Sequence, residues 1–121
     1  MAKVLIVDDS ETQLYSLQQI VEGAGHQAVT AINGEEGVEK AIKEVPDLIL
    51  MDVVMPGLNG FQATRKISKE KTTADIPVIF VTTKDQETDR IWGMRQGASA
   101  YITKPIDKSV LLDAINKALG N

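Results

Sequence analysis

Short apolar segments alternate with longer segments of mixed polarity along the whole chain. Five short segments have the length and composition of β-strands, and they span Lys3–Val7, Gln27–Ala31, Leu48–Met51, Val78–Thr82 and Ala100–Thr103. The first, third and fourth are almost continuously apolar, which is typical of central strands in a parallel sheet that is covered on both faces. The second and fifth contain more polar residues and suit the edges of the sheet.

Each gap after a predicted strand contains a helix signal. A residue able to cap a helix N-terminus precedes an amphipathic stretch in every gap, namely Ser10, Asn33, Asn59, Asp85 and Asp107. Five strands that alternate with five helices predict a parallel sheet with right-handed crossovers and helices on both faces. A (β/α)₈ barrel needs about 250 residues. A chain of 121 residues therefore favours an open, doubly wound α/β sheet.

Composition narrows the class of protein. The chain has 121 residues, a formal net charge of −4 and no cysteine. The absence of cysteine excludes disulfides, thiolate metal sites and a cysteine nucleophile. No apolar run approaches the roughly 20 residues that span a bilayer, and there is no dense basic stretch. We therefore expect a single domain over residues 1–121, a cytoplasmic location, no membrane insertion and no nucleic-acid partner.

Polar side chains collect where four of the predicted strands end. They are Asp8 and Asp9, Asp52, Thr82 with Thr83, and Lys104. The carboxyl ends of parallel strands share one edge of the sheet, which is where doubly wound sheets bind ligands. Adjacent carboxylates repel each other, so their cluster indicates a nearby cation. Because the available ligands are all oxygen atoms, the predicted metal is Mg²⁺.

This edge suggests phosphoryl chemistry. A carboxylate beside Mg²⁺ and a lysine can attack a phosphoryl group and form an aspartyl phosphate. Asp52 stands alone on a central strand, whereas Asp8 and Asp9 form the pair best placed to hold a metal. We therefore predict Asp52 as the phosphoacceptor, with Lys104 supplying positive charge and Thr82 donating a hydrogen bond to the phosphate. Each feature alone is typical of an ordinary loop or cap, and their coincidence on one edge favours a site.

The segments "VDDS", "DVVMPGLNG", "VTT" and "YITKP" resemble, in order and spacing, the receiver domains of two-component response regulators. The resemblance covers the whole chain and implies a flavodoxin-like (βα)₅ fold with strand order 2-1-3-4-5. It implies that a CheA-like histidine kinase donates the phosphoryl group to Asp52. It also implies Mg²⁺ bound by Asp9, Asp52 and the backbone carbonyl of Val54, with Asp8 contributing through water.

The same resemblance implies a switch. Thr82, with Thr83 beside it, and Tyr101 match the family's switch residues: Thr82 would move toward the phosphate, and the Tyr101 ring would turn into the space behind it. The changed surface would include Ile91, Trp92 and Arg95 on the predicted fourth helix. Trp92 fits either a helix core or an exposed contact surface. The Lys104–Pro105 bond is expected to be cis, since proline tolerates that isomer and receiver domains usually have it there.

The segments "DVVMPGLNGFQATR" and "VTTKDQETDRIWGMRQGA" resemble, more narrowly, regulators of twitching motility in type IV pilus systems. No output domain is expected after residue 121, so the protein resembles a stand-alone receiver, which we expect to be a monomer. It would either signal to a motility-machinery protein or act as a phosphate sink. Val54 and Lys84 depart from the usual pattern at positions that flank the path of hydrolytic water. Gly93 stands within the fourth helix and weakens it by up to about 1 kcal/mol relative to alanine.

The alternative function is an enzyme, a phosphatase or phosphotransferase that uses an aspartyl phosphate on small substrates. Such an enzyme would require a second acid close after the nucleophile, but "DVV" provides none. A nucleotide-binding fold would require a glycine-rich loop after the first strand, and "VDDSE" contains no glycine. We therefore predict a binding module, not an enzyme, that changes only its own phosphorylation.

Overall fold

Strands and helices alternate through the computed structural model, which describes residues 1–120. The strands are β1 (Lys3–Val7), β2 (Gln27–Ala31), β3 (Leu48–Met51), β4 (Val78–Thr82) and β5 (Ala100–Thr103). The helices are α1 (Glu11–Gly23), α2 (Gly34–Glu44), α3 (Gly60–Lys69), α4 (Glu87–Arg95) and α5 (Lys108–Ala118). The strand bounds are those predicted from the sequence. No helix within the described part of the chain combines the length and the apolar character needed to cross a membrane.

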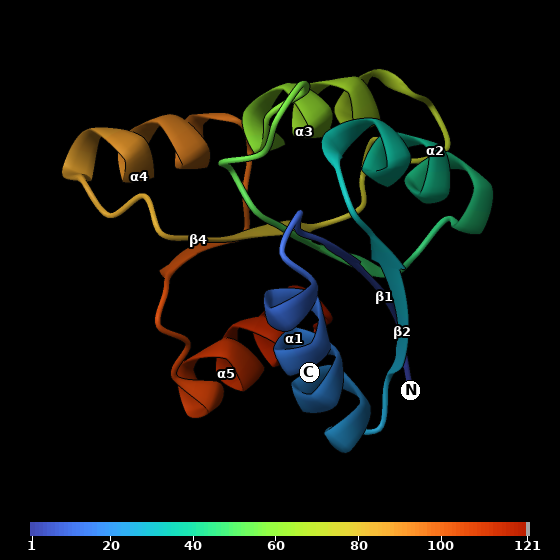
Figure 1. Cartoon of the computed structure of the whole chain (residues 1–121). Coiled ribbons are helices and arrows are strands. Elements are labelled where there is room, and N and C mark those ends of the chain that lie inside the picture. Colours follow the sequence, from blue (N-terminus) through green and yellow to red (C-terminus); the bar gives the residue numbers. More distant parts are fainter. Residues whose placement is uncertain (121) are drawn as a thin grey trace.

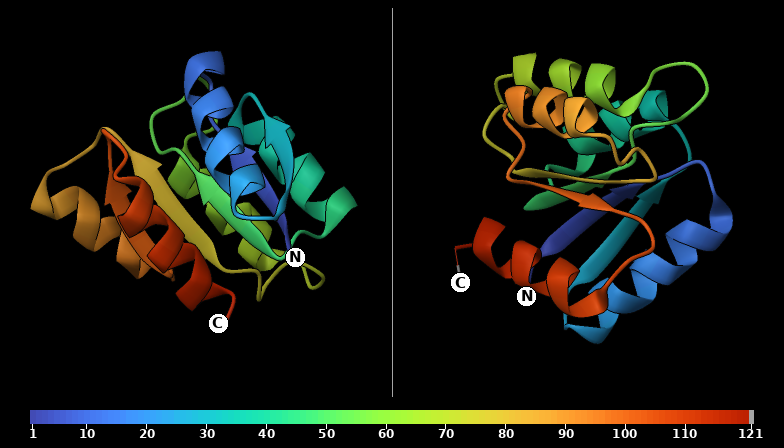
Figure 2. Two further views of the ribbon diagram at one scale, coloured as in Figure 1. Left: turned by 90° about the horizontal axis from the view of Figure 1, so that it is seen from below. Right: turned by 90° about the vertical axis from the view of Figure 1, so that its left-hand side faces the viewer.

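The five strands form one parallel sheet in the order β2-β1-β3-β4-β5. Helices α2, α3 and α4 cover one face of the sheet, and α1 and α5 cover the other (Figures 1 and 2). The more polar strands β2 and β5 lie at the two edges, as their composition predicts. The expected doubly wound, flavodoxin-like fold is confirmed.

The core consists of two apolar clusters, one on each face of the sheet. Successive residues of a strand point to opposite faces, so Leu5 and Val7 pack toward α2 and α3, whereas Val4 and Ile6 pack toward α1 and α5. These four side chains are essentially inaccessible to solvent. The polar residues that follow the strands therefore have a rigid, fully covered platform beneath them.

Side-chain caps fix the start of four helices where the sequence predicts them. In each case a side-chain oxygen accepts a backbone N–H of the first helical turn, and the capping residues are Ser10, Asn33, Asn59 and Asp107.

The predicted cap of α4 is wrong by one residue. The capping position is Gln86, not Asp85, and the helix starts at Glu87. The Asp89 carboxylate accepts a hydrogen bond from the Gln86 backbone N–H at 3.3 Å. This bond gives a partner to the N–H of the capping residue, which has none within the helix. Asp85 therefore lies in the β4–α4 turn.

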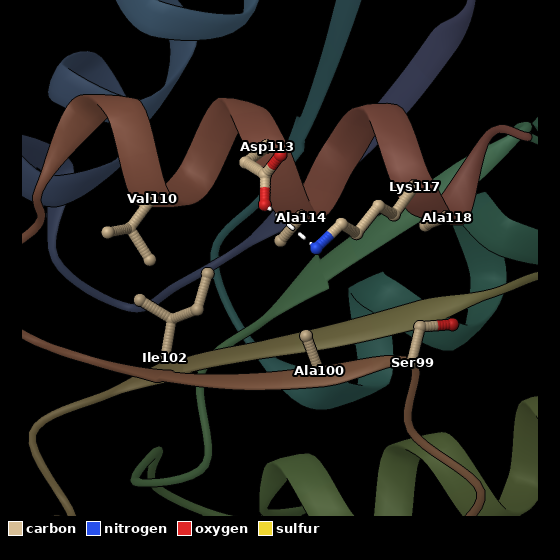
Figure 3. A pocket seen from close by; sticks show the side chains of 8 residues that line it. All are labelled: Ser99, Ala100, Ile102, Val110, Asp113, Ala114, Lys117 and Ala118. Carbon is tan, nitrogen blue, oxygen red and sulfur yellow. Dashed lines mark ion pairs between the residues drawn. The ribbon is translucent and has the colours of Figure 1, made fainter. Parts of the chain in front are cut away.

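A groove of about 560 Å³ runs between β5 and α5 (Figure 3). It exists because small side chains line it from both elements, including Ala100, Ala114 and Ala118. The ion pair of Asp113 with Lys117, 3.1 Å apart, bridges two turns of α5 at its margin (Figure 3). None of the polar residues at the carboxyl edge of the sheet lines this groove.

Candidate functional site

Three carboxylates converge at the carboxyl ends of β1 and β3, which are neighbours in the sheet. Asp8, Asp9 and Asp52 each offer one oxygen within 4.8 Å of the others. Asp8 is 1% exposed and Asp52 is 6% exposed, whereas Asp9 is open to solvent. The cluster therefore has two buried carboxylates and one accessible carboxylate, so a ligand can reach it from outside.

Lys104 brings positive charge to this cluster from the end of β5. Its Nζ donates to Asp8 Oδ2 at 2.8 Å and lies 3.7 Å from Asp52 Oδ2. The side chain is only 9% exposed, so these contacts are little screened by water. The Lys104–Pro105 bond is cis, as expected. The ammonium lies between the two buried acids and pairs more closely with Asp8 than with Asp52.

Backbone groups orient both buried carboxylates. The Val53 N–H donates to Asp52 Oδ1 at 2.8 Å, and the Ser10 N–H donates to Asp8 Oδ1 at 2.9 Å. Each acid therefore has one oxygen held by the main chain and a second oxygen turned toward Lys104. Such fixed orientation lowers the cost of reorganisation when charge moves at the site.

Burial raises the pKa of Asp52 above its ordinary value, and the neighbouring Asp8 carboxylate raises this pKa further. The Lys104 ammonium, the Thr82 hydroxyl and the Val53 N–H act in the opposite direction. The net increase means that the ionised Asp52 carboxylate is poorly solvated. An additional cation at this edge of the sheet would stabilise the ionised Asp52 carboxylate.

Gly60 allows α3 to begin directly behind Asp52. Its N–H donates to the Val53 carbonyl at 2.9 Å. A Cβ at this position would lie 2.0 Å from the Asp52 carbonyl oxygen, so no larger residue fits without displacing the loop that carries the acid. Sequence analysis did not identify Gly60. Its signals were its place immediately after the helix cap Asn59 and at the end of the segment "DVVMPGLNG".

The backbone N–H and carbonyl of Lys84 connect Thr82 with Tyr101. Thr82 Oγ1 is buried and accepts the Lys84 N–H at 3.2 Å, while the Tyr101 hydroxyl donates to the Lys84 carbonyl at 2.9 Å. Burial raises the pKa of Tyr101 to about 12, so the hydroxyl remains a donor at neutral pH. The Tyr101 ring is 5% exposed and already lies inward. Sequence analysis found the two side chains but not the Lys84 backbone between them.

The expected contact residues of α4 are at the surface. Ile91, Trp92 and Arg95 are all exposed, and Trp92 retains 45% of its surface, which excludes it from the core. Thr83 is exposed on the turn after β4, outside the buried part of the cluster.

A pocket of about 380 Å³ lies between the loop after β3 and α4, with Val54, Lys84 and Trp92 among its lining residues. It connects the residue two places after Asp52 with the exposed face of α4.

The donor set fits a hard divalent cation. Within residues 1–120, Asp8, Asp9 and Asp52 supply carboxylate oxygens, which Mg²⁺ prefers to nitrogen or sulfur donors. Two of the three acids are buried beside a single ammonium. One cation paired with three acids leaves excess negative charge, so a metal ion would complete the electrostatic balance.

Comparison with known proteins agrees with this geometry. Residues 4–116 match the family of the response regulator receiver domain. The chain belongs to this family. Protein PilH of Pseudomonas aeruginosa is 59% identical over 119 residues, which cover 98% of this chain and 98% of PilH. Response regulator PleD of Caulobacter vibrioides is 40% identical over 110 residues, which cover 91% of this chain and 24% of PleD.

Solved receiver-like structures have the same architecture. The chemotaxis protein CheY4 of Vibrio cholerae superposes with a TM-score of 0.91 at 31% sequence identity, covering 98% of this chain and 99% of CheY4. A receiver domain protein described as CheY-like, from Methanospirillum hungatei, superposes with a TM-score of 0.91 at 31% identity. The match covers 99% of this chain and 94% of the Methanospirillum chain. The receiver fold is therefore retained at sequence identities of about one third.

Proposed function

We propose that this receiver domain accepts a phosphoryl group from a histidine kinase on Asp52, with Mg²⁺ held by Asp8, Asp9 and Asp52 and by the backbone carbonyl of Val54. The observation that carries the proposal is the buried, backbone-oriented carboxylate of Asp52 within reach of two acids and Lys104. Family membership supports a regulatory role, in which the protein changes its own phosphorylation and does not turn over a substrate.

In the transfer step, an Asp52 carboxylate oxygen forms a bond to phosphorus as the donor's phosphorus–nitrogen bond breaks. The departing imidazole takes up one proton, so the donor histidine is regenerated. Lys104 lies where its ammonium can offset negative charge on the phosphoryl oxygens. When bound, Mg²⁺ would supply further charge neutralisation at the same oxygens. Asp8 keeps Lys104 in place through the 2.8 Å contact.

Phosphorylation of Asp52 would change the surface through Thr82 and the backbone of Lys84. A phosphoryl oxygen on Asp52 carries negative charge, so it would accept a strong hydrogen bond from the Thr82 hydroxyl. Thr82 already contacts the Lys84 N–H, and Lys84 is joined to Tyr101. The exposed residues Ile91 and Trp92 on α4 are the proposed binding surface, with Arg95 beside them and Thr83 at the edge of the phosphate site.

The resemblance to twitching-motility regulators, together with 59% identity to PilH, suggests a place in chemotaxis-like control of type IV pili. We infer a cytoplasmic monomer that receives phosphate from a CheA-like kinase. It would then contact a motility-machinery protein or drain phosphate from the kinase. The proposal requires neither nucleic acid nor membrane insertion.

A small phosphodonor such as acetyl phosphate tests the receiver function directly. In the presence of Mg²⁺ we expect the protein to take up one phosphoryl group per chain, in a linkage that is stable in acid and labile in base. Intact-mass measurement and release of inorganic phosphate would be followed together. Continuous release of phosphate at many turnovers per minute from a small substrate would instead support the phosphatase alternative.

Mg²⁺ is expected to raise the thermal unfolding midpoint, because a ligand that binds only the native state stabilises it by mass action. Asp9→Asn should remove most of this increase, since Asp9 is the accessible carboxylate of the cluster. Asp75→Asn, which changes an exposed acid in the α3–β4 connection, is the matched control and should retain the full increase. An undiminished Mg²⁺ response in Asp9→Asn would remove Asp9 from the metal site.

A further inference from the structure

Gly93 lies in α4 directly over the ring of Tyr101. It is buried and has ordinary helical backbone, not the left-handed conformation that favours glycine. Glycine is a poorer helix former than alanine because it loses more conformational freedom when ordered. The conformation of the helix therefore gives no reason for a glycine at this position.

The space around Gly93 does give a reason. A Cβ there would lie 2.6 Å from Cδ2 and 2.8 Å from Cε2 of Tyr101, and 3.3 Å from Cδ2 of Phe80. Contacts of 2.6 to 2.8 Å between carbon atoms are far inside the optimal separation of about 3.5–4.0 Å. Even alanine would require the ring or the helix to move. The absence of a side chain at residue 93 thus creates the socket in which the ring lies.

The remaining contacts of Tyr101 hold it in the same place. Its hydroxyl donates to the Lys84 carbonyl at 2.9 Å. Its ring packs against Phe80 with the ring centroids 6.1 Å apart. These contacts come from β4, the β4–α4 turn and α4, and none of them involves Asp8, Asp9 or Asp52. Protein groups away from the carboxylate cluster are therefore sufficient to fix the ring.

We propose that Gly93 is a positioning residue that holds the Tyr101 ring inward whether or not Asp52 carries a phosphoryl group. The consequence for signalling rests on the function proposed above. A change in the α4 surface does not require rotation of Tyr101, and phosphorylation acts on that surface through Thr82 and the backbone of Lys84. The socket keeps the Tyr101 ring in the same inward position in both states of this receiver, so the ring does not move when the protein switches.

Selective nitration of tyrosine with tetranitromethane tests this proposal. The chain contains two tyrosines, and Tyr15 is 65% exposed, so it serves as an internal reference in every sample. Peptide mass spectrometry distinguishes the two sites. In the wild-type protein we expect nitration of Tyr15 and protection of Tyr101, both with and without Mg²⁺ and the phosphate mimic beryllofluoride.

Gly93→Ala should expose Tyr101, so that its nitration rate approaches that of Tyr15. The matched control is Gly23→Ala, at the end of α1, where a Cβ would meet no atom within 4 Å, and Tyr101 should remain protected in it. Protection of Tyr101 in Gly93→Ala would show that the socket does not hold the ring. Nitration of wild-type Tyr101 at the rate of Tyr15 without beryllofluoride, and protection with it, would show that the phosphoryl site sets the ring position.

A second measurement covers the possibility that Gly93→Ala unfolds the protein. Gly93→Ala should lower the thermal unfolding midpoint when Tyr101 is present. In a Tyr101→Ala background it should raise the midpoint, because the better helix former no longer meets the ring. A decrease of equal size in both backgrounds would overturn the proposal. Failure of beryllofluoride to bind would count against the proposed function alone, since nitration without it still reports the ring position.

Discussion

Asp52→Asn is expected to abolish uptake of a phosphoryl group from acetyl phosphate while leaving the fold intact. The amide lacks the ionised oxygen that attacks phosphorus, yet its carbonyl oxygen can still accept the Val53 N–H. Lys104 keeps its 2.8 Å contact with Asp8, so no buried charge loses its only partner. Intact-mass measurement reports the result, with Asp75→Asn as the control that should still gain one phosphoryl group. A full mass increase in Asp52→Asn would contradict the assignment.

The same substitution should stabilise the protein at neutral pH when Mg²⁺ is absent. Burial and Asp8 raise the pKa of Asp52 in the folded state, so the native protein binds this proton more tightly than the unfolded chain. The contribution of Asp52 to stability is therefore fully present below the unfolded pKa and is lost as pH rises through the folded pKa. The gain in stability from Asp52→Asn should therefore become smaller as pH falls from the folded pKa of Asp52 toward its unfolded pKa. A gain in stability that stays constant from neutral to acidic pH would contradict the raised pKa of Asp52.

Lys104→Met is expected to destabilise the protein by about 3 kcal/mol at neutral pH without Mg²⁺, because removing one member of a buried ion pair leaves uncompensated charge. Here the loss would leave both Asp8 and Asp52 without their shared ammonium. Urea unfolding measures the change. Lys117→Met is the matched control, since it breaks the exposed Asp113 pair at 3.1 Å, and it should have little effect because exposed pairs contribute little.

Two conditions should partly restore the stability of Lys104→Met. Mg²⁺ supplies positive charge at the same acids, and it should stabilise this variant more than the wild-type protein. Acidification should also narrow the deficit, because loss of the ammonium removes one cause that lowers the pKa of Asp52. A deficit that responds to neither Mg²⁺ nor pH would mean that lost packing of the lysine stem, not charge, explains it.

The fold was predictable because its signals are local. Each strand is a short apolar run, and four helix starts are set by a side chain that bonds within its own first turn. The start of α4 differs from the prediction by one residue, because only Asp85 was considered as its cap. The structure places the cap at Gln86, whose backbone N–H donates to the Asp89 carboxylate at 3.3 Å.

The site was predictable only in part. Parallel strands bring their carboxyl ends to one edge, so the positions of Asp8, Asp9, Asp52 and Lys104 follow from the strand assignment. The closer pairing of Lys104 with Asp8 does not follow, because it depends on where the turn after β5 places the side chain.

Two glycines escaped functional interpretation for a related reason. Gly60 and Gly93 each make room for a group outside their own helix, the Asp52 carbonyl oxygen and the Tyr101 ring. A glycine in a helix looks like a local weakness when only its own element is considered. Its role becomes visible once the neighbouring elements are in place.

Chemical trapping of the modified residue tests the central claim most directly. After treatment with acetyl phosphate and Mg²⁺, borohydride reduces an aspartyl phosphate to homoserine, and peptide mass spectrometry locates the converted residue. We predict homoserine at position 52 alone. Asp8 is also buried and held by the backbone, but its second oxygen is paired closely with Lys104 at 2.8 Å, whereas Asp52 Oδ2 lies 3.7 Å from that ammonium. Asp9 is exposed and is the proposed accessible metal ligand. Conversion of Asp8 or Asp9, or no conversion under conditions that phosphorylate a known receiver, would contradict the assignment of Asp52 as the phosphoacceptor.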